Sequence, residues 1–373
     1  MCEEHVKKNL PAALIWNQHD GRLSNEHDMN IHDLLRKTGN GEHLSHTELL
    51  QLLSLAPDCS ESYLVMAESN RISKELTGNK AEVHAQLALN RAPCRCNCAF
   101  CSFAQKNAIF ANETQLAPEA AVAYARQFEK EGANAIFVMT TAHYPFELFL
   151  EISQELRKQL KPETILIANV GDQSLVNAYK IKDAGYAGVY HSLRLREGID
   201  TGIDPGIRKN SIQNFQEAGL RVGTCVEPVG PEHTPVELAD MICFTASINP
   251  CFSGAARRIP IPGTELFQRG TISELRMAQI VAVTRLGMPR TVLGNCTHEP
   301  CTLGGLAGAN LFWAEVGANP RDTKEKTEQG RGETVMRCRV LFRECGWDIY
   351  EGPSRYYGSE FYGSTNKCVQ VLS

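Results

Sequence analysis

The chain has 373 residues, 43% of them hydrophobic and 22% charged, and a net charge of −5. This balance gives no sign of the clustered basic surface that nucleic-acid binding requires, so chemistry on a small molecule is the better default. No run of about 18 apolar residues predicts a membrane span. The polar start of the chain differs from a secretory signal, and fourteen cysteines suit a reducing, anaerobic interior, so a cytoplasmic protein is expected.

Residues 1–80 are predicted to form an N-terminal extension with a helical cover. Residues 1–40 show no clear periodicity and suggest a loosely packed segment with one short helix. Ser45 to Glu48 have the pattern of a helix capping box, and leucines at helical spacing follow them. A second helix is predicted over residues 61–76, ended by Gly78. Together these helices are expected to cover one end of a barrel.

Residues 81–318 alternate between strand and helix patterns at the pace of βα units. Candidate strands are residues 85–90, 135–141, 164–170, 187–192, 221–227, 256–261, 290–294 and 309–314. Helical patterns between them cover residues 118–131, 146–160, 175–184, 212–218, 236–247 and 272–286. This order predicts an α/β protein with a closed (βα)8 TIM-type barrel rather than an open sheet. Reactive groups should then gather at the carboxyl ends of the strands.

Residues 319–373 differ from the barrel in composition. They begin with a run of charges, continue through a helical pattern over residues 333–344, and end in an aromatic, glycine-rich stretch over residues 350–364. This is long for a mere terminus. We expect a C-terminal extension that closes the mouth of the barrel.

Four cysteines lie within eight residues directly after the first predicted strand. Cys94, Cys98 and Cys101 have the spacing C-x3-C-x2-C, which fits three irons of a [4Fe–4S] cluster and leaves the fourth iron open to a ligand. Cys96 makes the assignment of the three ligands ambiguous. A structural zinc site would need a second C-x2-C pair, which the chain lacks, and a disulfide knot is disfavoured in a chain with core enough to fold without one.

With the aromatic Phe100 before its last cysteine, this loop resembles the signature of the radical S-adenosylmethionine (radical SAM) superfamily. The resemblance covers roughly residues 44–348 and is greatest to the biotin synthase subgroup, which includes biotin synthase, the hydrogenase maturase HydE, methylornithine synthase PylB and the hydrogenase maturation protein HmdB. It implies a [4Fe–4S] cluster, S-adenosylmethionine (SAM), and a flavodoxin- or ferredoxin-type reductant. It also implies a 5′-deoxyadenosyl radical that abstracts hydrogen from a small-molecule substrate.

The resemblance assigns further residues to SAM. Arg208 corresponds to an arginine that binds the SAM carboxylate, a task suited to the forked guanidinium. Glu197 corresponds to a glutamate that contacts SAM in relatives, and Arg194 and Ser192 lie where relatives place ribose and substrate contacts. The remaining implied contacts are Phe100 in the cluster loop, Thr140 for the amino group, and Ile261 for adenine.

Three residues are candidates for proton transfer at strand ends: His143, His298 and Glu299. His298 and Glu299 lie between Cys296 and Cys301, so this stretch could instead hold a second iron–sulfur cluster. Cys338 and Cys345 in the tail would complete its ligands. If His298 and Glu299 instead transfer substrate protons, Cys296 and Cys301 are inert.

The chain departs from biotin synthase at the auxiliary cluster that serves there as sulfur donor. Val138 and Ala168 occupy two of the matching places, Cys225 is offset by about one position, and His298 falls near the arginine that completes that cluster. The resemblance therefore favours rearrangement or fragmentation in the biosynthesis of a cofactor or modified amino acid. Sulfur insertion with an auxiliary cluster is the alternative, and a non-enzymatic iron–sulfur carrier is a third.

Overall fold

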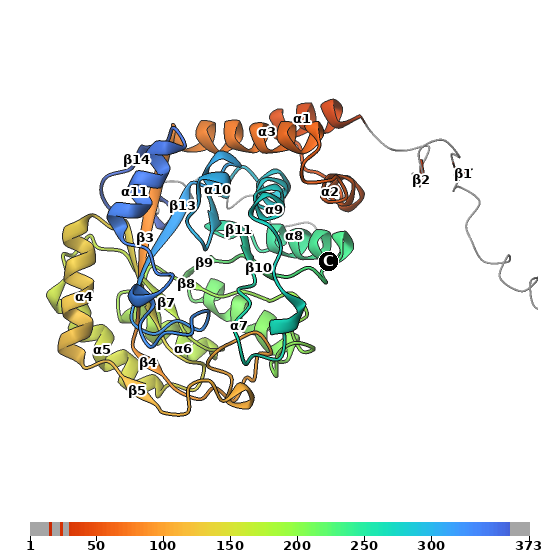
Figure 1. Cartoon of the computed structure of the whole chain (residues 1–373). Coiled ribbons are helices and arrows are strands. Elements are labelled where there is room, and N and C mark those ends of the chain that lie inside the picture. Colours follow the sequence, from red (N-terminus) through yellow and green to blue (C-terminus); the bar gives the residue numbers. More distant parts are fainter. Residues whose placement is uncertain (1–14, 17–22, 25–29, 359–373) are drawn as a thin grey trace, which may run out of the picture.

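The computed structural model describes residues 15–16, 23–24 and 30–358, and its centre is a closed parallel barrel (Figure 1). The strands follow one another round the ring in chain order, and the pairing of β13 with β3 closes it. Two short segments, β9 and β10, share the fifth position, and both pair with β11. The strands are β3 (Lys80–Ala88), β6 (Ala135–Met139), β7 (Leu166–Asn169), β8 (Gly188–Tyr190), β9 (Arg221–Gly223), β10 (Val226–Val229), β11 (Phe252–Arg257), β12 (Gly294–Thr297) and β13 (Leu311–Val316).

Helices surround the barrel. In α5 (Phe146–Gln159), for example, the buried Phe149, Ile152 and Leu156 recur at helical spacing and face the strands. The other surrounding helices are α4 (Pro118–Glu131), α6 (Leu175–Asp183), α7 (Pro205–Glu217), α8 (Pro235–Ser247), α9 (Glu274–Gly287) and the short α10 (Thr302–Leu306). The predicted (βα)8 barrel is therefore confirmed.

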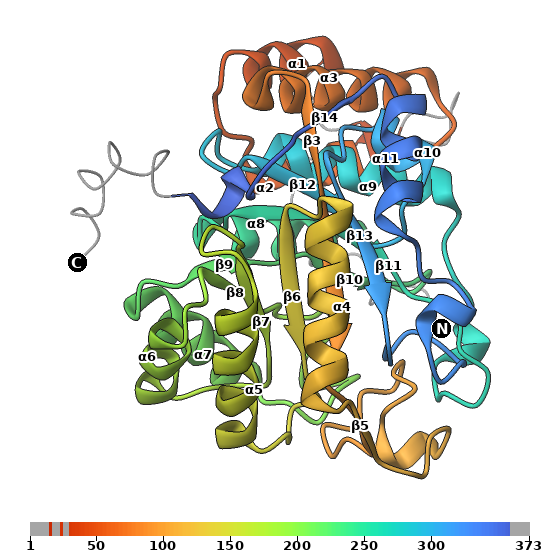
Figure 2. The ribbon, with the colours of Figure 1, turned by 90° about the vertical axis from the view of Figure 1, so that its left-hand side faces the viewer.

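Three helices precede the barrel: α1 (Ile31–Gly39), α2 (His46–Leu53) and α3 (Ser60–Thr77). Ser45 and Glu48 make both bonds of the capping box that begins α2, and α3 ends at Gly78, whose φ of 62° is left-handed. The helices lie across the end of the barrel at which β3 begins (Figure 2). A short pair, β1 (Ile15–Trp16) with β2 (Leu23–Ser24), is also described, whereas the rest of the expected segment 1–29 lies outside the described residues.

Three barrel strands differ by several residues in position from the sequence prediction. β3 begins at Lys80 rather than at residue 85. β11 begins at Phe252 and ends at Arg257, before Pro260 and Pro262, because proline cannot donate to a strand ladder. β12 covers Gly294–Thr297 rather than residues 290–294, although its sequence is polar. Cys296 therefore lies within a barrel strand and not in the loop after it.

The tail divides between the two ends of the barrel. Its first part lies at the mouth, where the amide of Ser102 in the cysteine loop donates to the carbonyl of Pro320. After α11 (Val335–Glu344), the segment β14 (Asp348–Ile349) pairs with the beginning of β3. Tyr356 and Tyr357 then pack among the aromatic side chains of the barrel core. The end of the described tail thus lies at the opposite end of the barrel from the one expected.

None of the described helices has the length and apolar character needed to cross a membrane.

The exposed carboxyl-end face of the barrel carries long irregular connections. The largest runs from β3 to α4 and contains the small pair β4 (Asn90–Arg91) and β5 (Thr114–Gln115), which holds the base of the cysteine loop. This loop and its surroundings form the candidate site.

Candidate functional site

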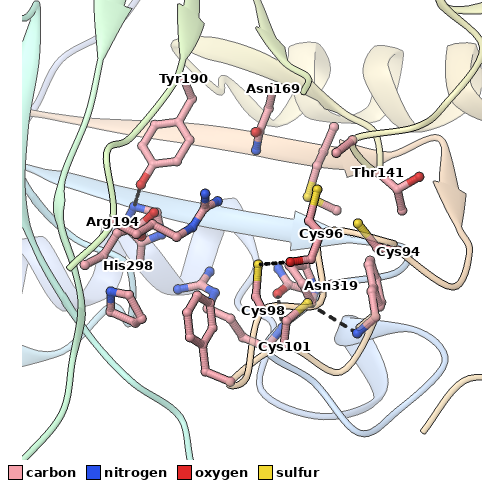
Figure 3. Close-up of a pocket in the computed structure, with 18 of the residues that line it drawn as sticks. Cys94, Cys96, Cys98, Cys101, Thr141, Asn169, Tyr190, Arg194, His298 and Asn319 are labelled. Atoms are coloured by element: carbon pink, nitrogen blue, oxygen red, sulfur yellow. Dashed lines mark hydrogen bonds between the residues drawn. The ribbon is translucent and has the colours of Figure 1, made fainter. Parts of the chain in front are cut away.

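A large cavity opens at the carboxyl ends of the strands, with about 1290 Å³ of empty space when the solvent at its open mouth is included. It is lined by the cysteine loop, by residues at the ends of the strands, and by the first residues of the tail (Figure 3). Most of the residues singled out from the sequence lie on its wall. Those on the wall are Cys94, Cys98, Phe100, Cys101, Thr140, Arg194, Arg208, Ile261 and His298.

Backbone hydrogen bonds fold the cysteine loop into a compact turn. The amide of Cys94 donates to the carbonyl of Phe103 (2.7 Å), and the amide of Cys101 donates to that of Cys98 (3.1 Å). Asn107 reaches back to the Cys101 carbonyl (2.8 Å). These bonds direct the Cys94, Cys98 and Cys101 side chains into one cavity, as Figure 3 shows.

The fourth thiol of the loop lies beside the first. The ligand atoms of Cys94, Cys96 and His143 are all within 4.8 Å of one another. Contact with Cys96 lowers the pKa of Cys94 to about 5, and the same contact raises the pKa of Cys96. His143 approaches Cys94 through Nδ1 (4.0 Å) from an exposed position at the rim. Cys96 thus shares the cavity with the three cysteines of the spacing pattern.

The thiols fit an iron–sulfur cluster by their chemistry. Burial raises the pKa of Cys98 to about 11 and also raises that of Cys101, so thiolates there require a compensating positive charge. Three convergent thiolates are the donor set that iron–sulfur clusters take, and the irons supply that charge. Arg194 and Arg208 lie on the same wall, and their positive charges also favour the thiolate form of Cys98 by lowering its pKa.

Arg208, in the first turn of α7, is held by acidic and imidazole groups. Its Nε lies 3.4 Å from the Asp172 carboxylate and 3.8 Å from that of Glu197, and its Nη1 lies 2.9 Å from Nε2 of His191. The guanidinium is buried, and this burial, together with Arg194, lowers its pKa. Burial likewise lowers the pKa of His191 to about 4, so the imidazole is neutral at pH 7. Arg208 therefore presents a fixed cation to the cavity.

Glu197 and Ser192 lie behind the cavity wall and hold it together. Glu197 accepts hydrogen bonds from the amide of Arg194 (3.0 Å) and the hydroxyl of Thr201 (2.6 Å). Ser192 accepts hydrogen bonds from the Thr224 hydroxyl (3.1 Å) and from the amide of Cys225 (3.2 Å). These bonds tie the end of β8 to the fifth strand. Both side chains position their neighbours.

The segment after β11 makes an apolar ledge on the cavity wall. Ile261 lies on the wall, and its carbonyl accepts a hydrogen bond from the Thr264 hydroxyl (2.7 Å). The turn between them requires Gly263, whose φ is 89°. On the opposite side of the mouth, the amide of Thr140 donates to the carbonyl of Asn169 (3.0 Å).

The three candidates for proton transfer lie in three different places. Alternate residues of an extended chain face opposite sides, so Cys296 and His298 face the barrel interior while Thr297 and Glu299 face outward. His298 lines the main cavity, and its Nε2 lies 3.2 Å from the Tyr190 hydroxyl. Glu299 instead forms an ion pair with Arg257 (2.6 Å) at a second, smaller hollow.

The four cysteines expected to hold a second cluster do not form one ligand group. Cys301 caps α10 by accepting from the amide of Gly304 (3.3 Å). Cys338 and Cys345 donate to the carbonyls of Trp313 and Thr302, as ordinary buried thiols do. Of these four cysteines, only Cys296 belongs to a close group of metal-ligand atoms among the described residues, and its partners there are Cys225 and His298. The strand register, which the sequence prediction misplaced at β12, separates Cys296 from Cys301.

Several wall residues had no role in the sequence interpretation. Asn169 lies at the end of β7, and Glu227 lies in β10. Each is a polar residue within a predicted strand, and that is the sequence signal that could have identified it as a site residue. Arg321 belongs to the charged run of the tail and pairs with Glu315 (2.8 Å) at the end of β13. No sequence pattern places Arg321 at the cavity, because only the path of the tail brings it there.

Comparison with models of known protein families finds no match. Curated proteins do resemble the chain: it is 24% identical over 313 residues to biotin synthase 1 of Corynebacterium diphtheriae, covering 80% of this chain and 84% of that protein. It is 25% identical over 272 residues to the biotin synthase of Desulforudis audaxviator, covering 70% and 81%.

Two solved structures share the fold. Methylornithine synthase (PylB) superposes with a TM-score of 0.72 at 17% identity, covering 87% of this chain and 98% of that one. The FeFe-hydrogenase maturase HydG from Carboxydothermus hydrogenoformans gives a TM-score of 0.71 at 18% identity, covering 89% and 81%. The likeness shows that the present chain shares the fold of these proteins.

Proposed function

Because the chain belongs to the radical SAM superfamily, in its biotin synthase-like subgroup, we propose that it cleaves SAM reductively to start a radical reaction on a small organic substrate. The observation that carries this proposal is the position of Cys94, Cys98 and Cys101. Their loop follows the first barrel strand, and all three side chains face the large cavity. A [4Fe–4S] cluster held by these residues would supply the electron that converts bound SAM to methionine and a 5′-deoxyadenosyl radical.

The other wall residues have roles in binding and positioning in this proposal. Arg208 binds the carboxylate of SAM through its fixed guanidinium, and Glu197 acts by holding the turn beside it. Thr140 contributes backbone near the amino group, and Ile261 packs against adenine with apolar surface. Phe100 helps to exclude water from the loop.

The substrate occupies the part of the cavity near Tyr190 and His298. Of the two proton-transfer candidates in this stretch, only His298 faces the substrate, because Glu299 is turned away into an ion pair. We place the reaction among rearrangements or fragmentations in cofactor or modified amino acid biosynthesis. Sulfur insertion is less favoured, because the cysteines expected to hold an auxiliary cluster lie apart.

Anaerobic reconstitution with iron and sulfide tests the proposal. With dithionite and SAM, the wild-type protein should release methionine and 5′-deoxyadenosine, and a flavodoxin- or ferredoxin-type protein should replace dithionite. Cys98→Ala should reduce iron content and 5′-deoxyadenosine to background. Cys96→Ala is the matched control, since it removes a thiol of the same loop, and should retain both.

Each outcome has a distinct meaning. A wild-type protein that binds iron but forms no 5′-deoxyadenosine would behave as an iron–sulfur carrier, and the enzymatic proposal would be wrong. If Cys96→Ala lost the cluster and Cys98→Ala kept it, the assignment of the three ligands would be wrong while the reaction class stood.

A further inference from the structure

Three potential metal ligands from distant parts of the chain meet inside the barrel. Cys225 lies between β9 and β10, Cys296 lies in β12, and His298 follows that strand. The two sulfurs are 2.8 Å apart, and Nε2 of His298 is 3.4 Å from the sulfur of Cys225. All three ligand atoms lie within 4.8 Å of one another. Two sulfurs that bind one tetrahedral zinc ion at about 2.3 Å lie about 3.8 Å apart, so the two thiols must separate by about 1 Å for one ion to contact all three ligands.

This group differs from the other buried cysteines of the chain. The thiols of Cys338 and Cys345 donate to backbone carbonyls, which is the usual arrangement for an inert buried thiol. The sulfurs of Cys225 and Cys296 instead converge on each other and on an imidazole. They are 1% and 0% exposed, so water is excluded from this side of the group.

The imidazole is held with Nε2 towards the sulfur of Cys225, the side on which an ion would bind. The His298 ring packs against that of Trp313, with ring centroids 4.7 Å apart, and its Nε2 lies beside the Tyr190 hydroxyl (Figure 3). Trp313, Tyr190 and His298 all line the main cavity, whereas the two cysteines lie behind it. An ion bound here would therefore have protein ligands on one side and the cavity on the other.

We propose that Cys225, Cys296 and His298 form a binding site for one divalent ion of the zinc class, with the fourth coordination position open to the cavity. Two thiolates and one neutral imidazole are a known ligand set for tetrahedral zinc with an open site. Binding releases one proton from each thiol, so the charges of the ion and the two thiolates cancel in the barrel interior. No oxidant or reductant is required.

A two-iron cluster fits the group less well. Such a cluster needs four protein ligands, and the described residues provide three ligand atoms within reach of one another. A single tetrahedral ion needs no fourth residue, because a molecule in the cavity can occupy the last position. The ion would give an amine, thiolate or carboxylate of that molecule a direct contact.

Metal analysis of the full-length protein, purified anaerobically after growth with zinc and then loaded with iron at the cysteine loop, tests the site. About one zinc per chain is expected in addition to iron. Cys296→Ala and His298→Ala should each lose the zinc and keep the iron. Cys251→Ala is the matched control, because Cys251 is equally buried in the same aromatic core but outside the ligand group, and it should keep both metals.

A loop variant separates this site from the proposed function. Cys94 is one of the three proposed cluster ligands and also belongs to the close group that it forms with Cys96 and His143. The Cys94→Ala variant should therefore lose iron but retain zinc. Cobalt provides a second measurement: Co²⁺ added to iron-loaded wild-type protein should give a thiolate-to-metal absorption band that Cys225→Ser lacks. Circular dichroism establishes that each variant is folded.

Three results would overturn the proposal. The first is a wild-type protein that holds no zinc or cobalt beyond the level of Cys296→Ala. The second is extra iron, beyond about four per chain, that disappears in Cys296→Ala, because it would indicate a cluster at this place. The third is a Cys225–Cys296 disulfide found by mass spectrometry in protein kept under reductant.

Discussion

At the scale of single residues, the cavity depends on charged groups fixed by buried partners. Arg208 is the best example, since two carboxylates and an imidazole hold one guanidinium at the wall. A free arginine would lose much side-chain entropy on binding a ligand, whereas this one has already lost it. The arrangement therefore suits recognition of a carboxylate by a pre-positioned fork.

Arg208→Lys tests this role. Lysine keeps the positive charge but cannot make two parallel bonds to a carboxylate, so SAM affinity should fall about tenfold or more, equivalent to about 1.4 kcal/mol. Equilibrium dialysis of the iron-loaded protein measures it. Arg196→Lys is the control, because Arg196 is close in sequence but pairs with Glu237 outside the cavity wall. Equal affinities for Arg208→Lys and wild type would rule out the assignment.

At the scale of elements, the tail completes the end of the barrel opposite the cavity. β14 extends the edge at the start of β3, and the following turn places Ser354 against the buried carboxylate of Glu82. The amide of Arg355 donates to the other oxygen of that carboxylate (2.9 Å). His84 completes the group through Nε2, which is 3.2 Å from the Ser354 hydroxyl. This polar group secures the tail to the first strand.

Ser354→Ala should weaken this attachment. The Glu82 carboxylate would lose a hydrogen-bond donor while remaining buried, which typically costs about 1–3 kcal/mol. A lower guanidinium midpoint in tryptophan fluorescence of the cluster-free protein would report the loss. Ser54→Ala, at the exposed end of α2, should change the midpoint little. If both variants unfolded at the wild-type midpoint, the tail would contribute no stability through Ser354.

At the scale of the whole molecule, ion pairs around the mouth join segments that are far apart in the chain. Arg258, after β11, pairs with Glu232, and Arg196 pairs with Glu237 at the start of α8. Burial by itself would raise the pKa of Glu232, but the hydrogen bond and charge of Arg258 outweigh it and bring the pKa to about 2. Arg196 similarly brings the pKa of Glu237 to about 2 against the effect of burial. The mouth therefore depends on ionised carboxylates.

Stability should accordingly fall in acid. The folded-state pKa of Glu232 lies below the usual value of 4.5 that it has in the unfolded chain, so its contribution is complete above pH 4.5 and is lost as the pH falls towards 2. Denaturant midpoints of the cluster-free protein between pH 7 and pH 3 measure this. Glu232→Gln should reduce the pH dependence, whereas Glu119→Gln, at an exposed helix start, should leave it unchanged. An unaltered pH dependence in Glu232→Gln would contradict the role of this pair.

The sequence by itself determined the features that depend on neighbouring residues. The alternation of strand and helix patterns predicted the (βα)8 barrel, because each pattern reflects which side of a local element is buried. The spacing of Cys94, Cys98 and Cys101 predicted a ligand loop, because eight residues can fold back on themselves wherever the rest of the chain goes. Helix starts such as the capping box at Ser45 were equally readable, since cap and helix are adjacent.

Only the tertiary structure decided which distant residues share a space. A strand reverses the direction of its side chains at every residue, so the exact course of β12 sends His298 into the barrel and Glu299 out of it. The same course brings Cys296 to Cys225, 71 positions earlier in the chain, and away from Cys301. Closure of the barrel and the path of the tail determine these encounters, and both result from packing over the whole chain rather than from any local pattern.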